Sequence, residues 1–162
     1  LYFTGVFPDM PYSYRPHHFE DFEEGQTFES VGRTVTEYDF VMHSAFTGDW
    51  TELHTNKEYA EAENFGERVA HGPMTFSLAT GFVYRIGILE RTVLAFLGMN
   101  YMDIPNPVYM DDTISLDMEV VETKDISSRD DSGLVVIDTT MTNQEDTVVF
   151  EGDMKFLIKK RE

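Results

Sequence analysis

The side chains best suited to chemistry lie in one stretch of the chain, where Asp49 and His54 are followed by His71 and Gly72. A carboxylate and an imidazole that reach the same water molecule can orient it, take a proton from it and deliver a proton elsewhere. The pair Asp49 and His54 therefore predicts acid–base chemistry on water. Asp-x4-His is a weak pattern by itself, and the alternative is a loop aspartate that caps a turn beside a histidine bonded to backbone.

Gly72 would act through its backbone, because Gly72-Pro73 begins a predicted helix, with proline at the first helical position and glycine as the cap before it. The N–H groups at the start of a helix lack intrahelical partners and carry a partial positive charge. Such a group can hold a carbonyl oxygen as it gains negative charge, which is an oxyanion hole. Glycine also permits a substrate to approach this backbone closely.

Two predicted helices flank the reactive residues. Thr36, with an acidic capping partner three positions later, starts a helix that ends at Gly48. Residues 48–54 form a predicted loop, which is where catalytic residues concentrate. The next helix is expected to begin at Thr55, with Glu58 completing its capping box.

A buried helix and a long sheet are expected to position this loop. Residues 74–88 are apolar on every face, which predicts a helix surrounded by protein. Most of the later segments alternate apolar and polar residues with a period of two and are joined by short turns, which indicates an antiparallel sheet. The predicted fold class is α+β, with a long antiparallel sheet wrapped around a buried central helix. Strands are expected at 27–35, 93–103, 113–127, 133–143 and 147–159.

The length of 162 residues suits a single domain. Residues 1–20 read as an N-terminal arm, because Pro8, Pro11 and Pro16 interrupt an aromatic-rich stretch. The domain itself is expected to span residues 21–162.

The composition excludes several classes of protein. The chain has 12 Lys+Arg against 30 Asp+Glu and a net charge of −18, which disfavours nucleic acid as a partner. It has no cysteine, which excludes disulfides, thiolate zinc sites and cysteine nucleophiles. No apolar run approaches the roughly 20 residues of a membrane helix, and no signal peptide is evident, so a cytoplasmic protein without membrane association is expected. The excess of carboxylates over lysine favours a halophilic protein, whose self-repulsion is screened by salt.

The stretch FTGDWTELHTNKEYAEAENFGERVAHGPMTFSLATGF, residues 46–82, resembles the hydratase motif of the MaoC-like family. This family includes (R)-specific enoyl-CoA hydratases and has the hotdog fold. Gly-Asp, aliphatic-His, Phe-Gly and aliphatic-Ala-His-Gly occur in the family's order, and the resemblance covers about residues 19–160. The family's usual Asn-Pro is replaced by Thr51-Glu52, a departure that concerns the substrate more than the type of reaction.

The resemblance implies an acyl-CoA hydratase or dehydratase that adds water to a trans-2-enoyl-CoA and forms an (R)-3-hydroxyacyl-CoA. Catalytic roles carry over to Asp49, His54 and the Gly72 amide, and Thr80 falls where some members place a serine. No cofactor is implied beyond the CoA of the substrate, and no metal. Hotdog domains of this kind usually pair through their sheet edges, so a homodimer or a higher homo-oligomer is expected.

Further substrate contacts are expected around this cluster. The phosphates of CoA need a basic rim on so acidic a protein, and the nearby cations in sequence are Lys57, Arg68, Arg85 and Arg91. Trp50 either walls the acyl pocket or packs the loop, and His71 either contacts substrate or bonds to backbone at the helix start. The five histidines match no tight metal-ligand spacing.

Two other functions remain open at this point. A hotdog thioesterase often carries a water-activating acid on its central helix, and residues 73–89 contain none. A non-catalytic acyl-CoA-binding subunit would have no need of both Asp49 and His54.

Overall fold

The computed structural model describes residues 16–161, so most of the expected N-terminal arm lies outside the described residues. Within them, a short 3-10 helix and the first two strands come first, three helices and one longer helix follow, and the remaining strands complete the chain. None of the described helices combines the length and the apolar character that crossing a membrane requires. The helices are η1 (Phe19–Asp21), α1 (Glu37–Thr47), α2 (Glu52–Thr55), α3 (Lys57–Ala62) and α4 (Gly72–Arg85).

The strands form one antiparallel sheet with the order β1-β5-β6-β7-β3, in which β2 also pairs with β5 and β4 with β7. The long central strands follow each other in sequence through tight turns, as their alternating pattern predicts. The strands are β1 (Thr27–Glu29), β2 (Arg33–Thr34), β3 (Val93–Gly98), β4 (Met102–Asp103), β5 (Thr113–Asp125), β6 (Ser132–Thr142) and β7 (Val148–Lys159).

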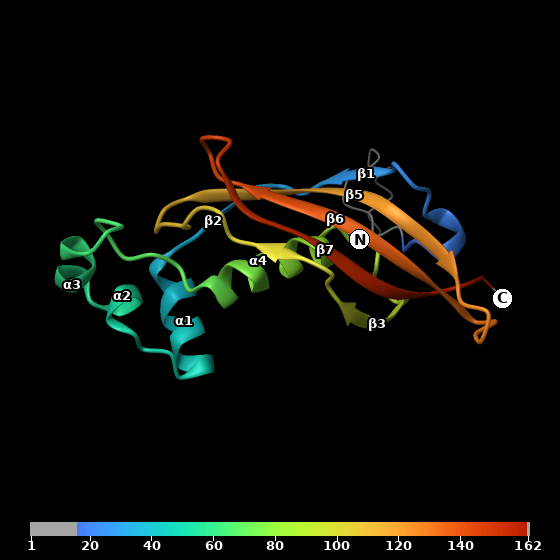
Figure 1. Ribbon diagram of the computed structural model, residues 1–162, viewed down its shortest axis with the longest axis horizontal. Coiled ribbons are helices and arrows are strands. Elements are labelled where there is room, and N and C mark those ends of the chain that lie inside the picture. The colour runs from blue at the N-terminus through green and yellow to red at the C-terminus, as the bar shows by residue number, and fades with distance from the viewer. Residues whose placement is uncertain (1–15, 162) are drawn as a thin grey trace, which may run out of the picture.

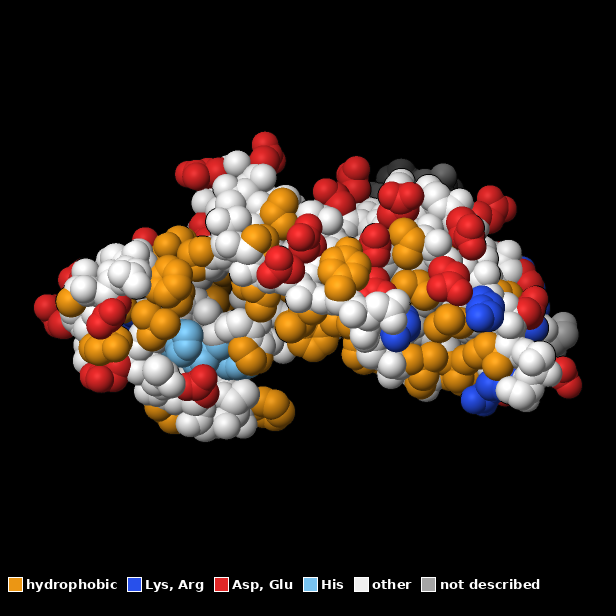
Figure 2. Space-filling model, viewed as in Figure 1, with side chains coloured by type: hydrophobic (Ala, Val, Ile, Leu, Met, Phe, Trp, Pro, Cys, Tyr) orange, Lys and Arg blue, Asp and Glu red, His pale blue; other side chains and the backbone are white. Residues whose placement is uncertain are grey.

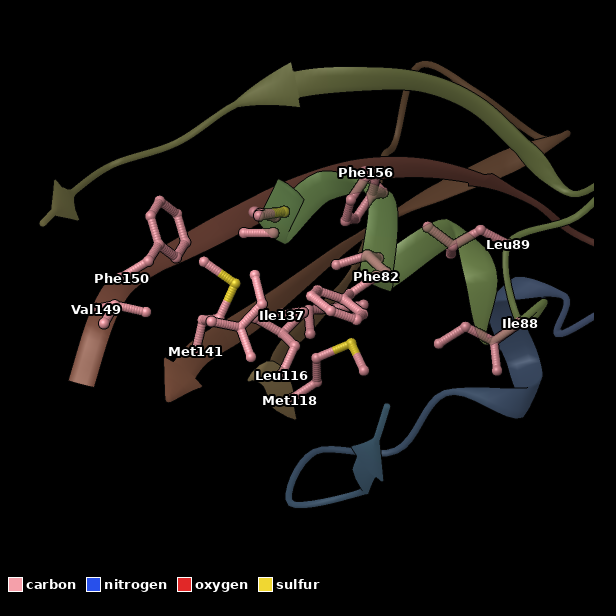
Figure 3. Packing of buried hydrophobic residues seen from close by; sticks show 14 of the residues in the cluster. Phe82, Ile88, Leu89, Leu116, Met118, Ile137, Met141, Val149, Phe150 and Phe156 are labelled. Carbon is pink, nitrogen blue, oxygen red and sulfur yellow. The ribbon is translucent and has the colours of Figure 1, made fainter. Parts of the chain in front are cut away.

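The sheet arches over α4, and the hydrophobic core lies between them (Figure 1). Phe82 of α4 points into a cluster of sheet side chains that includes Leu116, Ile137 and Phe156 (Figure 3). Burying one such side chain stabilises the fold by about 1.5–3 kcal/mol. The predicted α+β layout, a sheet wrapped around a central helix, is therefore confirmed. On the side of α4 away from the sheet, a stripe stays exposed in the single chain: Pro73, Ser77, Gly81 and Arg85.

The first predicted helix forms as expected. Asp39 accepts a hydrogen bond from the Thr36 N–H at 2.8 Å and completes the capping box of α1. Gly48 ends the helix with φ of 80°, a left-handed conformation that glycine adopts without strain. Helix α1 therefore delivers the chain to Asp49 in a fixed direction.

The predicted loop at 48–54 was only partly right, because α2 forms within it and carries His54. The predicted cap of the next helix was wrong. Thr55 is the last residue of α2, and its hydroxyl donates to the carbonyls of Trp50 and Thr51 at 3.2 and 3.1 Å. This hydroxyl therefore does not cap the next helix. Asn56 caps α3 instead and accepts from the Tyr59 N–H at 3.3 Å.

Two predicted strands are interrupted. The segment 27–35 breaks between β1 and β2, where Ser30 exchanges two hydrogen bonds with the backbone of Leu116. The segment 93–103 breaks between β3 and β4, where the buried Asp153 carboxylate accepts from the N–H groups of Asn100 and Tyr101 at 2.6 and 2.9 Å. Both breaks depend on contacts with distant parts of the chain, which periodicity does not register.

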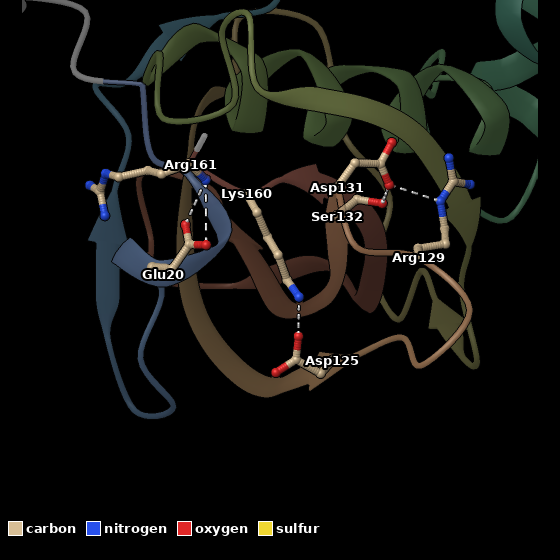
Figure 4. A network of polar contacts seen from close by, with 7 residues as sticks. All are labelled: Glu20, Asp125, Arg129, Asp131, Ser132, Lys160 and Arg161. Atoms are coloured by element: carbon tan, nitrogen blue, oxygen red, sulfur yellow. Dashed lines mark hydrogen bonds and ion pairs between the residues drawn. The ribbon is translucent and has the colours of Figure 1, made fainter.

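The two ends of the described chain are tied together by polar contacts. Arg161 donates its backbone N–H to Glu20 at 3.1 Å, and Lys160 pairs with Asp125 (Figure 4). The Arg161 guanidinium also pairs with Asp21. The Lys160 ammonium also lies 5.6 Å from the centre of the Phe19 ring. Residues 16–21 are thereby held against the end of the sheet farthest from α1 (Figure 1).

The face of the sheet away from α4 carries like charges in register. Glu119 of β5 lies opposite Asp138 of β6, which lies opposite Asp153 of β7. Like charges directly across strands destabilise a sheet. Burial, followed by the charges of Asp153 and Glu119, raises the pKa of Asp138 above its usual range. The ionised Asp138 is therefore less stable in the folded protein than in the unfolded chain.

We predict that Asp138→Asn raises the melting temperature at pH 7 by about 2 °C in dilute buffer, since one unfavourable cross-strand charge is removed. The gain should shrink in about 1 M KCl, where charges are screened within about 3 Å. It should also shrink as the pH falls through the raised pKa of Asp138, because wild type then loses the same charge. Thermal unfolding measures each case, with Glu145→Asn in the β6–β7 turn as a control. An unchanged or lower melting temperature for Asp138→Asn in dilute buffer contradicts the prediction.

Candidate active site

The structure brings Asp49, His54 and His71 together where the α1–α2 connection, α2 and the start of α4 meet. One possible ligand atom from each of the three side chains lies within 4.8 Å of those of the other two. Figure 2 shows histidine side chains at the bottom of a hollow between the helical end of the molecule and the rest. Three separate elements therefore contribute to one cluster.

His54 is held with one nitrogen free. Its Nδ1 lies 2.7 Å from the carbonyl oxygen of Val69. A carbonyl can only accept, so Nδ1 carries the hydrogen and donates it, which leaves Nε2 with a lone pair in the neutral ring. The His54 ring thus presents a fixed proton acceptor to the cluster.

His71 is buried, with 1% of its surface exposed. Its Nε2 lies 3.1 Å from the Asp49 carbonyl oxygen and 3.3 Å from the Ser44 hydroxyl, so Nε2–H donates to the carbonyl. Its Nδ1 is buried without a hydrogen-bond partner among the described residues. Burial is the main cause that lowers the pKa of His71, and a neutral ring is consistent with these contacts. Two roles were expected for His71, a substrate contact or a bond to backbone at the helix start, and the bond to the Asp49 carbonyl is of the second kind.

The three imidazoles of this region form a row. The rings of His54 and His71 are stacked with centroids 3.8 Å apart, and His43 of α1 lies on the other side of His71 at 4.6 Å. Desolvation is the main cause that lowers the pKa of His43. Sequence analysis did not connect His43 with the site, because its place in the row depends on how α1 folds back.

Asp49 is oriented by Thr51, a residue that sequence analysis noted only as a departure from the family pattern. One carboxylate oxygen of Asp49 accepts from the Thr51 N–H at 3.1 Å and from its hydroxyl at 2.5 Å. These two bonds hold the pKa of Asp49 below its usual range, and the carboxylate itself is exposed. Asp49 is therefore an ionised hydrogen-bond acceptor at neutral pH.

Gly72 is the first residue of α4, so the helix begins one residue earlier than predicted, with His71 as its N-cap and Pro73 second. The Gly72 N–H has no intrahelical partner at this position. It also directly follows the stacked His71, which places it beside the cluster. A Cβ at Gly72 would lie 3.4 Å from the Ile104 Cδ1, so apolar side chains approach this backbone closely.

A small cavity of about 100 Å³ adjoins His54. Trp50 lines it together with Phe40 and Ser44, although 55% of the Trp50 side chain stays exposed in the single chain. Arg68 lies at the same cavity and donates to both carboxylate oxygens of Glu37 at 2.9 and 2.6 Å. The Arg68 guanidinium is therefore already engaged by a carboxylate.

The remaining predicted residues lie farther from the cluster. Thr80 stands eight residues after Gly72, about 12 Å along the helix axis, and its hydroxyl donates to the Ser77 carbonyl at 2.8 Å. Arg85 is at the opposite end of α4 from Gly72. Lys57 pairs with Glu61 at 3.6 Å on the surface.

No metal was expected here, but Asp49, His54 and His71 form a group that could hold one, since each offers one ligand atom and these atoms all lie within 4.8 Å of one another. The Nε2 hydrogen of His71 is committed to a carbonyl, so its Nδ1, which has no partner among the described residues, would be the ligand atom. A tetrahedral site with bonds of about 2.0–2.2 Å would need donor atoms roughly 3.4 Å apart.

A protein-family model described as "MaoC like domain" matches residues 21–144, which are most of the chain. The chain belongs to the MaoC-like domain family. A monoamine oxidase regulatory protein from Archaeoglobus superposes with a TM-score of 0.85 at 33% identity, covering 92% of this chain and 99% of that one. An (R)-specific enoyl-CoA hydratase from Rhodospirillum rubrum is 36% identical over 67 residues, which are 41% of this chain and 43% of that protein.

The fold is the hotdog fold. A Mycobacterium tuberculosis protein described as a double hotdog superposes with a TM-score of 0.79, covering 90% of this chain and 45% of that one. Its identity of 19% makes this a likeness of fold alone. In this chain the sheet arches over α4 (Figure 1).

We predict that Thr51→Val raises the pKa of the Asp49 carboxyl, since the variant loses the hydroxyl donor that contributes most to lowering it. The pH titration of the Asp49 side-chain carbon by NMR measures this shift. Thr47→Val is the matched control, because the Thr47 hydroxyl contacts the Asp49 backbone N–H and not the carboxylate. Equal carboxyl titration in wild type and Thr51→Val would show that Thr51 does not tune Asp49.

Proposed function

We propose that this protein is a hydro-lyase that adds water to a trans-2-enoyl-CoA to give an (R)-3-hydroxyacyl-CoA, or removes it in the reverse direction. The observation that carries the proposal is the joint position of an ionised Asp49, a His54 whose Nδ1 alone is committed to backbone, and the Gly72 N–H at the start of α4. Membership of a family that includes dehydratases supports the type of reaction. The relative from Rhodospirillum rubrum supports the enoyl-CoA class of substrate.

In the hydration direction, a water molecule donates one hydrogen to the Asp49 carboxylate and the other to Nε2 of His54. Asp49 is the weaker base, because its pKa is held below the usual range by Thr51. The His54 nitrogen therefore takes the proton as the water oxygen bonds to the β-carbon of the substrate. The His54 imidazolium that forms stays hydrogen-bonded to Val69, which fixes its orientation.

The electrons of the carbon–carbon double bond move toward the thioester and make its oxygen an enolate. The Gly72 N–H donates to this oxygen, where the positive end of α4 stabilises the charge. The imidazolium then returns its proton to the α-carbon, which completes the addition of one water across the double bond. The chain's own groups thus supply the base, the acid and the oxyanion donor without a metal.

Thioester hydrolysis on the same fold is the alternative reaction. It would require a group that activates water toward the thioester carbon, and α4 carries no acidic side chain. A protein that only binds acyl-CoA would not need an oriented Asp49. Here Thr51 donates to the Asp49 carboxylate and His71 donates to the Asp49 carbonyl, so both contacts hold this residue in place. Both observations favour the hydro-lyase.

We predict that Asp49→Asn and His54→Gln each lower the rate of crotonyl-CoA hydration by about 10²–10⁴-fold, the usual contribution of acid–base groups. Loss of the enoyl thioester absorbance measures the rate, and an (R)-specific or (S)-specific 3-hydroxyacyl-CoA dehydrogenase identifies the product. Asp130→Asn, in the turn before β6, is the matched control and should keep full activity.

Melting temperatures near wild type separate a catalytic loss from a folding defect in these variants. Full hydration by Asp49→Asn or His54→Gln would overturn the roles given to these residues. Release of free CoA thiol by wild type, without hydration, would establish the thioesterase instead.

A second copy of the chain is proposed as the partner, joined through β3. This strand ends the sheet, so its outer edge has no neighbour among the described residues. Leu94 and Leu97 of β3 are 41% and 49% exposed, and Tyr84 of α4 is 42% exposed. A second copy related by a two-fold axis would continue the sheet in antiparallel fashion and cover these side chains.

We predict a mass of twice 18.7 kDa in sedimentation for wild type in about 1 M KCl, where charge repulsion is screened. Leu94→Lys combined with Leu97→Lys should shift the protein to the monomer, because two desolvated charges at the strand edge oppose pairing. Val121→Lys is the control, since Val121 is 40% exposed on β5, away from this edge. A wild-type monomer at micromolar concentration would contradict the pairing.

A further inference from the structure

A groove outside the Asp49–His54 cluster opens along the exposed side of α4. Its volume is about 290 Å³, and it is formed by one residue of β2 and by several residues of α4 from Ser77 onward. It lies beside β2, which pairs with β5, whereas β3 forms the other edge of the sheet. A second copy on β3 would therefore leave this side of α4 available. The lining residues are Arg33, Ser77, Leu78, Gly81, Phe82 and Arg85.

The groove is electrically unlike the rest of this acidic chain. It contains two guanidinium groups, and none of its lining residues is acidic. Arg33 pairs with Asp39 but keeps 38% of its side chain exposed. Arg85 takes part in none of the ion pairs found among residues 16–161, where most of the other cations are neutralised. Planar guanidinium groups in such a place suit a phosphate, which they can bind through two parallel hydrogen bonds.

The distance from Gly72 to the groove fits one kind of ligand. Arg85 follows Gly72 by 13 residues, which is about 20 Å along α4. An extended chain advances about 3.5 Å for every three bonds. On that scale, the roughly 13 bonds from the sulfur of CoA to its first phosphorus span about 15 Å. The remaining distance of about 5 Å is within the length of the Arg85 side chain, since side chains on a helix lean toward its N-terminus. A thioester whose carbonyl lies on the Gly72 N–H can therefore bring its diphosphate to the Arg85 guanidinium.

The surface between the two points is unobstructed. The exposed residues at every fourth position of α4 are Pro73, Ser77 and Gly81, all small, and Arg85 follows as the next in the row. The Ser77 hydroxyl donates to the Pro73 carbonyl at 2.8 Å, so it lies against the helix. An extended pantetheine arm can lie along this side of α4.

We propose that this groove is the binding site for the phosphate end of the acyl-CoA substrate, with Arg85 and Arg33 holding the diphosphate while the thioester lies at Gly72. The inference rests on the proposed function and adds the direction in which the substrate lies. Arg85, expected from the sequence to face the phosphates of CoA, is thereby assigned to the diphosphate. Arg33, which had no expected role, is assigned to the same group. Arg68 lines the smaller cavity beside His54 and not this groove, so it takes no part.

Gly81 allows a test that changes only charge. A Cβ at this position has nothing within 4 Å, so a side chain fits without rearrangement, and any residue but proline is a better helix former than glycine. Gly81→Glu places a carboxylate in the groove, and Gly81→Gln places a neutral side chain of the same shape there. The comparison of these two variants isolates the electrostatic contribution.

The first measurement is calorimetric binding of CoA and of pantetheine, which lacks phosphates, in 0.15 M KCl. Gly81→Glu should bind CoA at least 10-fold more weakly than Gly81→Gln, and Arg85→Gln at least 10-fold more weakly than wild type. Gly81→Glu should bind pantetheine like Gly81→Gln, and Arg85→Gln should bind it like wild type. Arg129→Gln, which changes a cation paired with Asp131 in another part of the molecule, is the control and should bind CoA like wild type.

Kinetics provide the second measurement. Arg85→Gln should raise KM for crotonyl-CoA at least 10-fold with kcat within about twofold, and leave both constants unchanged for crotonyl-pantetheine. Equal CoA affinity in Gly81→Glu and Gly81→Gln would overturn the groove as the phosphate site, even if hydration is observed. Charge-dependent CoA binding by a wild-type protein that hydrates no enoyl-CoA would support the groove and refute the hydratase.

Discussion

The arrangement of the candidate site depends on the burial of His71. Its ring is almost fully enclosed, so the Nε2 hydrogen must find an acceptor inside the protein, and it finds the Asp49 carbonyl. The same ring stacks on His54, and its own backbone begins α4 and so places the Gly72 N–H. One side chain thus fixes the distances among three elements of the site. This burial leaves Nδ1 of His71 without a hydrogen-bond partner among the described residues. A buried polar atom in that state lowers the stability of the fold by about 1–3 kcal/mol.

Much of the fold follows from local signals, and the exceptions have a common cause. The capping box at Thr36, Gly48 and the apolar segment that becomes α4 act within a few residues, and these features are where periodicity predicts them. The break between β3 and β4 is made by Asp153, which lies more than fifty positions away in sequence. The break between β1 and β2 likewise depends on the contact of Ser30 with Leu116, which lies 86 positions later in sequence. Local patterns predict elements, while long-range polar contacts decide where those elements stop.

The same division applies to the site. Residue type and spacing identify Asp49, His54 and Gly72 as candidates, because carboxylate, imidazole and helix N-terminus each have a recognisable local context. Thr51 acts through a hydroxyl that no local pattern distinguishes from any loop threonine. His43 is one more histidine on a helix until the fold sets it against His71. Charged residues are the least predictable, since their role depends on whether a carboxylate lies nearby, as Arg68 and Arg85 illustrate.

Charge is also divided between the two sides of the molecule. The strand side carries acids in register from β5 to β7, and Figure 2 shows acidic side chains spread over it. Helix α4 contains no acid along its 14 residues and ends in Arg85. The acids on the sheet therefore repel a polyanionic ligand, and the electrostatic potential is less negative beside α4. At physiological salt, screening within about 8 Å weakens the distant acids more than the nearby arginine. A net charge of −18 is thus compatible with binding phosphates beside α4, because this helix carries no acid of its own.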